Sequence, residues 1–464
     1  MRNSFAVLLI LLVIAGSVLM SLLLPNHSIE EKPNIIFLLT DDQRWDALGA
    51  MGNSEIMTPN LDRLAQEGVM FRNAYVTTPI CCTSRASILS GQYARRHKIN
   101  DFQTHFSRKA WKKCYPHLMK MAGYYSGFVG KYGVGSEKDF PLADFDYWKG
   151  IPGQPYYETE DDEGHEIHLT RKMGDQCLDF IRQAPDDQPF CLSVSFKAPH
   201  VQDGDLRQFI FDPAYQDLFR NTVIPPVKHG EDAVYEKFPE FFRENNEARN
   251  RWQIRFATPD MYQESVKAYY RLIYGVDVVV GKIRKALEEQ GLDKNTIIVF
   301  MGDNGFFLGE KGLAGKWFAY EESIRVPLLI YDPFLAPEKR GQIRDEIALN
   351  IDIAPTILNF AGIKVPNKMQ GRPLSATYTG QSDTWRSEFL FEHEFKHPGL
   401  PKSEGIISTT EKYFRYLPPA PPYEEMYDLI KDPDEMNNLA TQSEFNERKN
   451  AMRSRLEKLI DKSE

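Results

Sequence analysis

The stretch Asn34-Ile-Ile-Phe-Leu-Leu-Thr40, followed directly by Asp41-Asp42, decides the fold of this 464-residue chain. Its unbroken apolar run is typical of a strand buried on both faces of a parallel sheet. Further apolar runs predict strands at 127–129, 190–196, 296–301 and 326–331, and helical patterns lie between them, for example at 59–67 and about 263–290. Strands that alternate with helices predict an α/β fold with a large, mostly parallel sheet flanked by helices.

The pattern of apolar and polar residues changes after about residue 370. Short apolar runs at 389–393, 405–409 and 413–416 predict the strands of an antiparallel sheet, and a charged pattern at about 444–462 predicts a final helix. We therefore expect a main domain over 33–370 and a smaller C-terminal α+β subdomain over 371–464, which is near the short end of the range for domains.

The first 24 residues resemble an export segment. Arg2 precedes an uncharged, mainly apolar run over 5–24, which is long enough for either a signal peptide or an N-terminal membrane anchor. A positive charge before such a run places the following chain outside the cytoplasm. We expect an exported protein, in the periplasm or on the cell surface, with 5–24 as a candidate membrane tether.

The composition excludes several classes of protein. Hydrophobic residues make up 42% and charged residues 26%, which is ordinary for a globular chain and excludes a disordered or multi-span membrane protein. The net charge of −9 argues against nucleic acid as a partner. Five cysteines are too few for a disulfide scaffold, and their odd number leaves at least one to explain.

Polar side chains follow four of the predicted strands. Asp41-Asp42, Gly130-Lys131, Pro199-His200 and Asp303-Asn304 each come at or soon after a strand end. Because the carboxyl ends of parallel strands share one edge of a sheet, these side chains should meet there. The oxygen donors Asp41, Asp42, Asp303 and Asn304 suit Ca²⁺ or, less well, Mg²⁺. Taken separately, each acidic pair could also be turn chemistry.

Cys81 is the candidate nucleophile. It opens the segment Cys81-Cys82-Thr83-Ser84-Arg85, which predicts a short helix ending near Gly91. A helix start binds anions and lowers the pKa of a thiol, and Arg85 lies one turn further on, where it can support the same negative charge. The alternatives are a buried cysteine pair or a thiol that forms a bridge elsewhere.

These residues carry a family resemblance. Cys81 to Arg85, with Leu89-Ser90-Gly91, resembles the sulfatase motif C-x-[P/A]-S-R and its Leu-Thr-Gly-like end. Further segments resemble that family's other landmarks in the same order, and they are 34–42, 130–131, 197–200, 302–305, 316–327, 352–358 and 427–439. The resemblance implies the fold of the alkaline phosphatase-like superfamily and hydrolysis of sulfate esters, of a carbohydrate or of aryl sulfates in assays.

The resemblance also implies a mechanism. In that family the first cysteine of the motif, here Cys81, is converted to formylglycine by a maturation enzyme. One hydroxyl of the hydrated aldehyde attacks sulfur beside a Ca²⁺, and the other later expels sulfate. By position, the metal ligands are Asp41, Asp42, residue 81, Asp303 and Asn304. Arg85, Lys131 and Lys316 surround the sulfate oxygens, and His200 or Lys316 protonates the leaving oxygen.

Three residues depart from the family pattern: Thr83 stands for Pro or Ala, and Gly133 and Lys311 stand where histidines are common. The basic run over 95–98 is either a solvated face or a rim that admits a sulfated saccharide.

Two other functions remain open from the sequence. One is a phosphoester or phosphonate ester hydrolase of the same superfamily, and the other is a non-catalytic, membrane-tethered binding protein that keeps the fold.

Overall fold

The computed structural model describes residues 32–380, 384–417 and 420–464. Within it, Pro33–Glu464 forms one compact unit. The predicted export segment over 1–24 lies outside the described residues. Among the helices of the described part, none is both long and apolar enough to cross a membrane.

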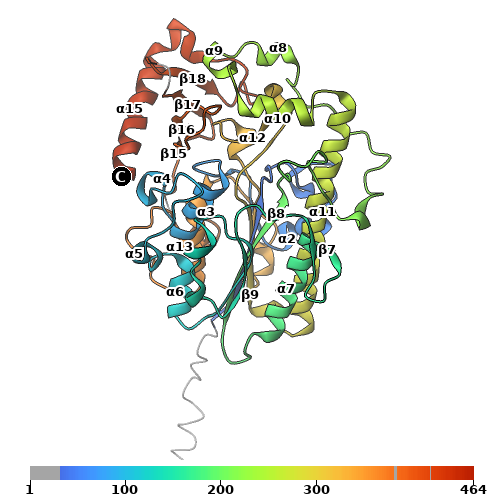
Figure 1. Ribbon diagram of the computed structural model, residues 1–464. Coiled ribbons are helices and arrows are strands. Elements are labelled where there is room, and N and C mark those ends of the chain that lie inside the picture. The colour runs from blue at the N-terminus through green and yellow to red at the C-terminus, as the bar shows by residue number, and fades with distance from the viewer. Residues whose placement is uncertain (1–31, 381–383, 418–419) are drawn as a thin grey trace, which may run out of the picture. The chain divides into compact units, whose positions relative to one another are not determined.

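An eight-stranded sheet lies at the centre of this unit (Figure 1). Its strand order is β13-β2-β12-β9-β1-β8-β4-β5. The parallel core consists of β9 (Thr296–Gly302), β1 (Asn34–Asp41), β8 (Phe190–Pro199), β4 (Tyr125–Lys131) and β5 (Tyr147–Ile151). Beyond β9 the direction changes, because β12 (Leu328–Tyr331) runs antiparallel to β9 and to β2 (Val69–Phe71), which pairs with β13 (Gln342–Arg344). The predicted, mostly parallel sheet is thus confirmed.

Two layers of helices cover the sheet, and strand β1 shows why. Its alternate residues Ile35, Phe37 and Leu39 belong to one core cluster, and Ile36 and Leu38 belong to another. The first cluster packs against α3 (Cys81–Ser90), α6 (Tyr115–Met121) and α13 (Ile353–Phe360). The second packs against α2 (Pro59–Glu67), α7 (Leu169–Gln183) and α11 (Pro259–Glu289). An apolar run without polar interruption therefore reflects burial on both faces.

A four-stranded antiparallel sheet follows in the C-terminal part, in the order β15-β16-β17-β18. Its strands are β15 (Glu388–His393), β16 (Ser403–Ser408), β17 (Glu411–Tyr416) and β18 (Tyr423–Asp428). The helix α15 (Asn446–Ser463) covers one face through an apolar cluster, and aromatic residues of the other face join the main core. Three of these strands and the helix are confirmed, whereas β18, whose sequence is mostly polar and acidic, was missed.

A buried ion-pair group ties this small sheet to the main domain. Lys412 of β17 is fully buried and lies 3.0 Å from Glu321 of α12 (Glu321–Ile324) and 2.7 Å from Glu435. Burial would raise the pKa of Glu321, but Lys412 and Arg325 lower it below its usual value. Burial raises the pKa of Glu435 to about 7 against the opposing charge of Lys412.

Replacing Lys412 with methionine should destabilise the protein by about 3–5 kcal/mol, because two buried carboxylates lose their shared cation. Without Lys412, burial raises the pKa of Glu321 and Glu435 in the variant above their unfolded values, so keeping them ionised costs the variant stability as the pH rises. The penalty of the substitution should therefore be largest near pH 8 and shrink towards pH 5. Urea unfolding of both proteins at the two pH values measures it. A penalty that does not change with pH would contradict this account.

Candidate active site

The carboxyl ends of β1 and β9 bring the predicted acids together. Thr40 pairs with Gly302 in the parallel register, and the amide of Asp303 donates to the carbonyl of Thr40 at 2.8 Å. Asp42 has a φ of +65°, which turns its backbone so that its amide donates to Asp303 Oδ1 at 3.1 Å. Asn304 Nδ2 donates to Asp42 Oδ1 at 2.6 Å. The expected meeting of these four residues is confirmed.

Three buried cations surround the acids. Lys131 Nζ lies 2.5 Å from Asp41 Oδ2, and Lys316 Nζ forms an ion pair with Asp42 Oδ1. Arg85 reaches both sides of the group: its Nη2 lies 2.9 Å from Asp303 Oδ2 and 3.5 Å from Asp41 Oδ2. These cations come from α3, from the end of β4 and from the segment after β11 (Ala314–Gly315). The predicted sulfate-binding residues therefore converge on one centre.

The acids differ in their protonation because of their neighbours. Burial would raise the pKa of Asp41, but Lys131, His200, Arg85 and Lys316 together hold it far below its usual range. Burial and then the charge of Asp41 raise the pKa of Asp303 to about 7. Crowded buried carboxylates that share one site need additional positive charge to ionise together. This electrostatic requirement fits a site for a divalent cation.

Two oxygen atoms of this group also support a site for a divalent cation. Asp41 Oδ1 and Asn304 Oδ1 are buried and have no hydrogen-bond partner. Buried polar atoms without a partner are uncommon in folded proteins. Atoms of Asp41, Asp42 and His200 also lie close enough to hold a metal ion together. The oxygen donors suit a hard cation such as Ca²⁺, so the residues present fit the metal that the sequence implied.

Cys81 is the first residue of α3, after Ile80 at the N-cap, and it is 1% exposed. The sequence led us to expect that the helix start lowers the pKa of this thiol. The opposite holds, because burial raises it and outweighs the opposing charges of Lys131 and Lys316. The unmodified thiol is therefore not an activated thiolate. It nevertheless lies within electrostatic reach of those lysines and of the acids.

His200 follows β8 and faces the acids with one ring nitrogen. Its Nδ1 lies 2.6 Å from the carbonyl oxygen of Val201, so Nδ1–H donates there and Nε2 is left as the acceptor of the neutral ring. Nε2 lies 3.3 Å from Gln154 Nε2 and 3.6 Å from Asp42 Oδ2. Burial lowers the pKa of His200, and the two aspartates oppose this only in part.

The structure adds residues to the site that the sequence did not reveal. Ser195 of β8 accepts a hydrogen bond from Arg85 Nη1, which also donates to the carbonyl of Lys131 at 2.8 Å. Gln154 approaches the ring of His200, as described above. Tyr157 donates its hydroxyl hydrogen to the carbonyl of His200 at 2.6 Å. A serine inside a strand and a glutamine in a loop carry no motif, so only the tertiary structure identifies them.

Two of the three departures from the family pattern, at Lys311 and Gly133, have structural explanations. Lys311 points away from the acids: its Nζ lies 3.4 Å from Glu322 Oε1 and donates to the carbonyl of Asp434 at 2.8 Å. Gly133 has a φ of +74°, and a Cβ atom there would lie 2.7 Å from Cδ of Arg85. A histidine therefore does not fit at 133 without displacing Arg85.

Replacing Gly133 with alanine should lower kcat/KM on a sulfate ester by about 10²-fold, since a misplacement near 1 Å of a group that binds the reacting atoms costs that much. The matched control is Gly291→Ala, because Gly291 has a similar φ of +71° but nothing within 4 Å of the added atom. Steady-state kinetics of the two variants separate displacement of Arg85 from backbone strain. Equal losses in both variants would contradict the assignment.

In the basic run over 95–98, Arg95 and His97 are engaged in structure, whereas Lys98 is exposed. Arg95 Nη2 lies 3.0 Å from Glu404 and its Nε 3.3 Å from Glu392, both in the C-terminal sheet. His97 is largely buried, and burial lowers its pKa to about 3. Arg95 therefore joins the C-terminal part to the main domain, whereas His97 contacts Ser87 of the main domain.

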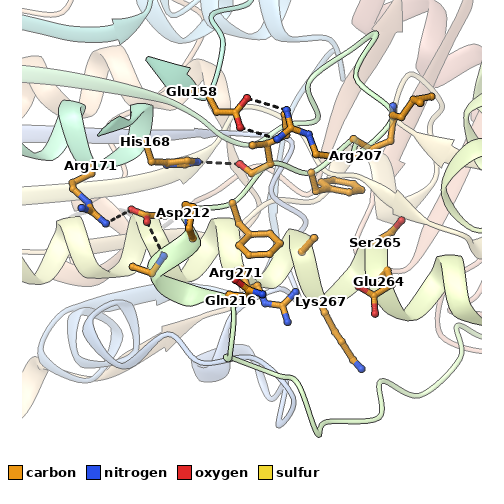
Figure 2. Close-up of a pocket in the computed structure, with 18 of the residues that line it drawn as sticks. Glu158, His168, Arg171, Arg207, Asp212, Gln216, Glu264, Ser265, Lys267 and Arg271 are labelled. Carbon is orange, nitrogen blue, oxygen red and sulfur yellow. Dashed lines mark hydrogen bonds and ion pairs between the residues drawn. The ribbon is translucent and has the colours of Figure 1, made fainter. Parts of the chain in front are cut away.

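A cavity of about 1470 Å³ lies beside the β6–β7 hairpin and α11 (Figure 2), with β6 at Glu158–Glu160 and β7 at Glu166–His168. Neither Cys81 nor the four proposed metal ligands line it. Two of its arginines are paired with acids: Arg171 lies 2.6 Å from Asp212, and Arg207 lies 2.7 Å from Glu158. We therefore place the chemistry at the sheet edge and not in this cavity.

Comparisons with known proteins agree with this geometry. A family model described as Sulfatase matches residues 33–363, and one described as N-sulphoglucosamine sulphohydrolase, C-terminal, matches 309–462. The chain is 28% identical to an N-acetylglucosamine-6-O-sulfatase of Bacteroides thetaiotaomicron, over 97% of this chain and 90% of that one. It is 30% identical to an arylsulfatase of Clostridium perfringens, over 93% and 95%. A solved structure in complex with its substrate D-glucosamine-2-N,6-O-disulfate is similar with a TM-score of 0.78, at 27% identity over 93% and 98% of the two chains.

Proposed function

The chain belongs to the sulfatase family and is a sulfuric ester hydrolase, and we propose that it removes sulfate from carbohydrates with a nucleophile made from Cys81 beside a bound Ca²⁺. One observation carries the proposal. Three buried cations and a group of acids converge at the sheet edge next to Cys81, within electrostatic reach of its side chain. Neutral small-molecule substrates would not require such a concentration of buried charge.

The proposed metal ligands are Asp41, Asp42, Asp303, Asn304 and residue 81. Two of their oxygen atoms are buried without a partner, which supports a cation held between the strand ends. When bound, Ca²⁺ would supply positive charge for a sulfate oxygen and for the nucleophile. His200 offers a nitrogen ligand, and hard cations such as Ca²⁺ prefer oxygen to nitrogen. We therefore propose that His200 contacts the substrate and not the metal.

The nucleophile is proposed to be formylglycine, made from Cys81 by a separate maturation enzyme. Its hydrated form would provide an oxygen nucleophile that the buried, protonated thiol does not offer. Thr83, which departs from the motif, lies in the same buried helix, with its Oγ1 3.7 Å from Sγ of Cys82.

The remaining residues bind the sulfate group and transfer the proton. Arg85, Lys131 and Lys316 are fixed before the substrate arrives, so they stabilise negative charge on the sulfate oxygens with little reorganisation. The pKa values of Lys131 and Lys316 are raised, since their acidic partners overcome burial, and both stay charged at neutral pH. Protonation of the leaving oxygen falls to His200 or Lys316.

The location and domain limits are also proposals. We propose that the chain is exported through its segment over 5–24, as a secreted or tethered protein of the periplasm or cell surface. We further propose that 33–370 is the catalytic part and that 371–464 is a subdomain packed against it.

A turnover assay on matched esters tests the function. The protein should release sulfate from 6-sulfated N-acetylglucosamine or from another sugar of a panel of sulfated saccharides, and from 4-nitrophenyl sulfate. It should act more slowly on 4-nitrophenyl phosphate, which distinguishes it from the phosphoester hydrolases of the same superfamily. A higher kcat/KM for the phosphate would overturn the proposal.

A further inference from the structure

Helix α10 (Glu247–Arg255) places two arginines beside Asp203, which lies three residues after His200. Arg251 and Arg255 are one helical turn apart, so their side chains share one face of the helix. Arg251 Nη1 lies 3.4 Å from Asp203 Oδ1, and Arg255 Nη2 lies 3.8 Å from the same oxygen. Both separations exceed those of a direct charged hydrogen bond.

This trio borders the catalytic centre. The guanidinium group of Arg251 lies 5.0 Å from the ring centre of Trp317, the residue after Lys316. Trp317 has a φ of +89°, which is rare for a bulky side chain and marks local strain of the kind that collects at functional sites. Burial would raise the pKa of Asp203, but His200, both arginines and Lys316 lower it, so Asp203 is in electrostatic contact with the site.

Arg255 is a buried cation with too few partners. It is 1% exposed, and its Nε donates to the neutral side chain of Gln208 at 2.9 Å. Its Nη1 is buried and has no hydrogen-bond partner. Burial and the nearby charge of Arg251 lower the pKa of Arg255 to about 9. Burying a guanidinium group with an unsatisfied N–H donor costs free energy, unless a ligand supplies the missing hydrogen-bond acceptor.

The arginines of the neighbouring cavity show the contrast (Figure 2). There Arg207 forms two bonds with Glu158, at 2.7 and 2.9 Å, and Arg171 lies 2.6 Å from Asp212. Gln208, the only strong partner described for Arg255, lies in the wall of the same cavity. Unlike Arg207 and Arg171, Arg255 has no carboxylate within 3.5 Å among the described residues, since Asp203 lies 3.8 Å away.

We propose that Arg251 and Arg255 form a second anion-binding subsite, which accepts another sulfate or a carboxylate group of the same saccharide. The inference rests on the proposed function and narrows its substrate class to saccharides with at least two anionic groups. Asp203, whose side chain is 47% exposed, occupies the subsite in the free protein and turns into solvent when the ligand arrives. The Nε of Arg251 donates to Glu247 Oε1 at 2.7 Å, so its Nη atoms and those of Arg255 would face the planar, paired oxygens of such groups.

The test compares substrates that differ by one charge. The first pair is 6-sulfated N-acetylglucosamine and glucosamine-2-N,6-O-disulfate, and the second is a 6-sulfated disaccharide with or without a carboxylate on the neighbouring sugar. In at least one pair, the wild type should prefer the doubly anionic member by about 10–100-fold in kcat/KM, as charged hydrogen bonds predict. A preference in the first pair would identify the ligand of the subsite as a sulfate group, and a preference in the second pair would identify it as a carboxylate.

Variants assign that preference to the arginines. Arg251→Gln, at a side chain that is 23% exposed, and Arg255→Gln should bring the ratio near one. Asp203→Asn should increase the ratio, because it removes the competing carboxylate. The control is Arg207→Gln, which should leave the ratio as in the wild type. Because the readout is a ratio, a general loss of activity in one variant cancels.

Three results would overturn the inference. They are equal kcat/KM values within both pairs, a preference that survives in both arginine variants, and an Asp203→Asn variant that loses the preference. The last result would instead make Asp203 an acceptor for sugar hydroxyl groups. If the wild type hydrolysed no member of either pair and no aryl sulfate, the proposed function itself would fail.

Discussion

Replacing Cys81 with alanine should reduce sulfatase kcat by at least about 10⁴-fold, the loss that removal of a covalent nucleophile produces in other hydrolases. We expect this effect because the side chain of residue 81 lies within electrostatic reach of Lys131, Lys316 and the acids. Cys81→Ser should be equally inactive in a host that converts only cysteine. Initial rates of sulfate release from an aryl sulfate measure both variants.

The neighbouring cysteine provides a matched control. Cys82 is buried in the same helix, and burial raises the pKa of its thiol to about 12, so it is an inert core residue. Cys82→Ala should retain kcat within a few-fold while costing about 1–3 kcal/mol of stability for the cavity. Full activity in Cys81→Ala, or inactivation of Cys82→Ala without unfolding, would contradict the assignment of the nucleophile.

Removal of the divalent cation should have the second-largest effect. We expect extensive dialysis against a chelator to lower kcat by about 10³-fold, because the loss of a preorganised charge in a water-excluded site costs several kcal/mol. It should also lower the melting temperature, and added Ca²⁺ should restore it, since a ligand that binds only the native state stabilises it by about 4 kcal/mol at a thousand times its Kd.

Variants assign the cation to the strand ends. Asp41→Asn and Asn304→Asp alter the proposed oxygen ligands at the ends of β1 and β9, so they should change the Ca²⁺-dependent melting shift as well as the activity. Asp212→Asn, in the wall of the separate cavity, serves as the control and should preserve the shift. A melting temperature that does not respond to Ca²⁺ in the wild-type protein would contradict the proposed metal site.

Much of the fold and the centre could be predicted because local sequence determines them. The run over 35–39 is apolar at every position, which predicts burial on both faces, and the acid pair after it must then lie at the sheet edge. Lys131, His200 and Asp303 also follow strands, so the parallel register alone brings them together. The structure confirms this arrangement.

Other features depend on contacts that one segment does not reveal. The pKa of Cys81 is raised because the whole centre is buried, which outweighs the helix start that local reasoning considered. Strand β18 carries acidic residues, but its Glu425 accepts hydrogen bonds from Tyr320 and Tyr427, so partners from other segments permit burial. From the sequence alone, Arg251 and Arg255 look like ordinary surface charges of a helix. Only the tertiary structure places them near Lys316.

The chemical state of residue 81 is the most direct test of the proposed mechanism. Mass spectrometry of the proteolytic peptide that ends at Arg85, from active protein made in its native host, measures this state. We predict a peptide in which residue 81 has lost sulfur and two hydrogens and gained one oxygen, as conversion of cysteine to formylglycine requires. Unmodified cysteine at position 81 in fully active protein would contradict the proposed nucleophile.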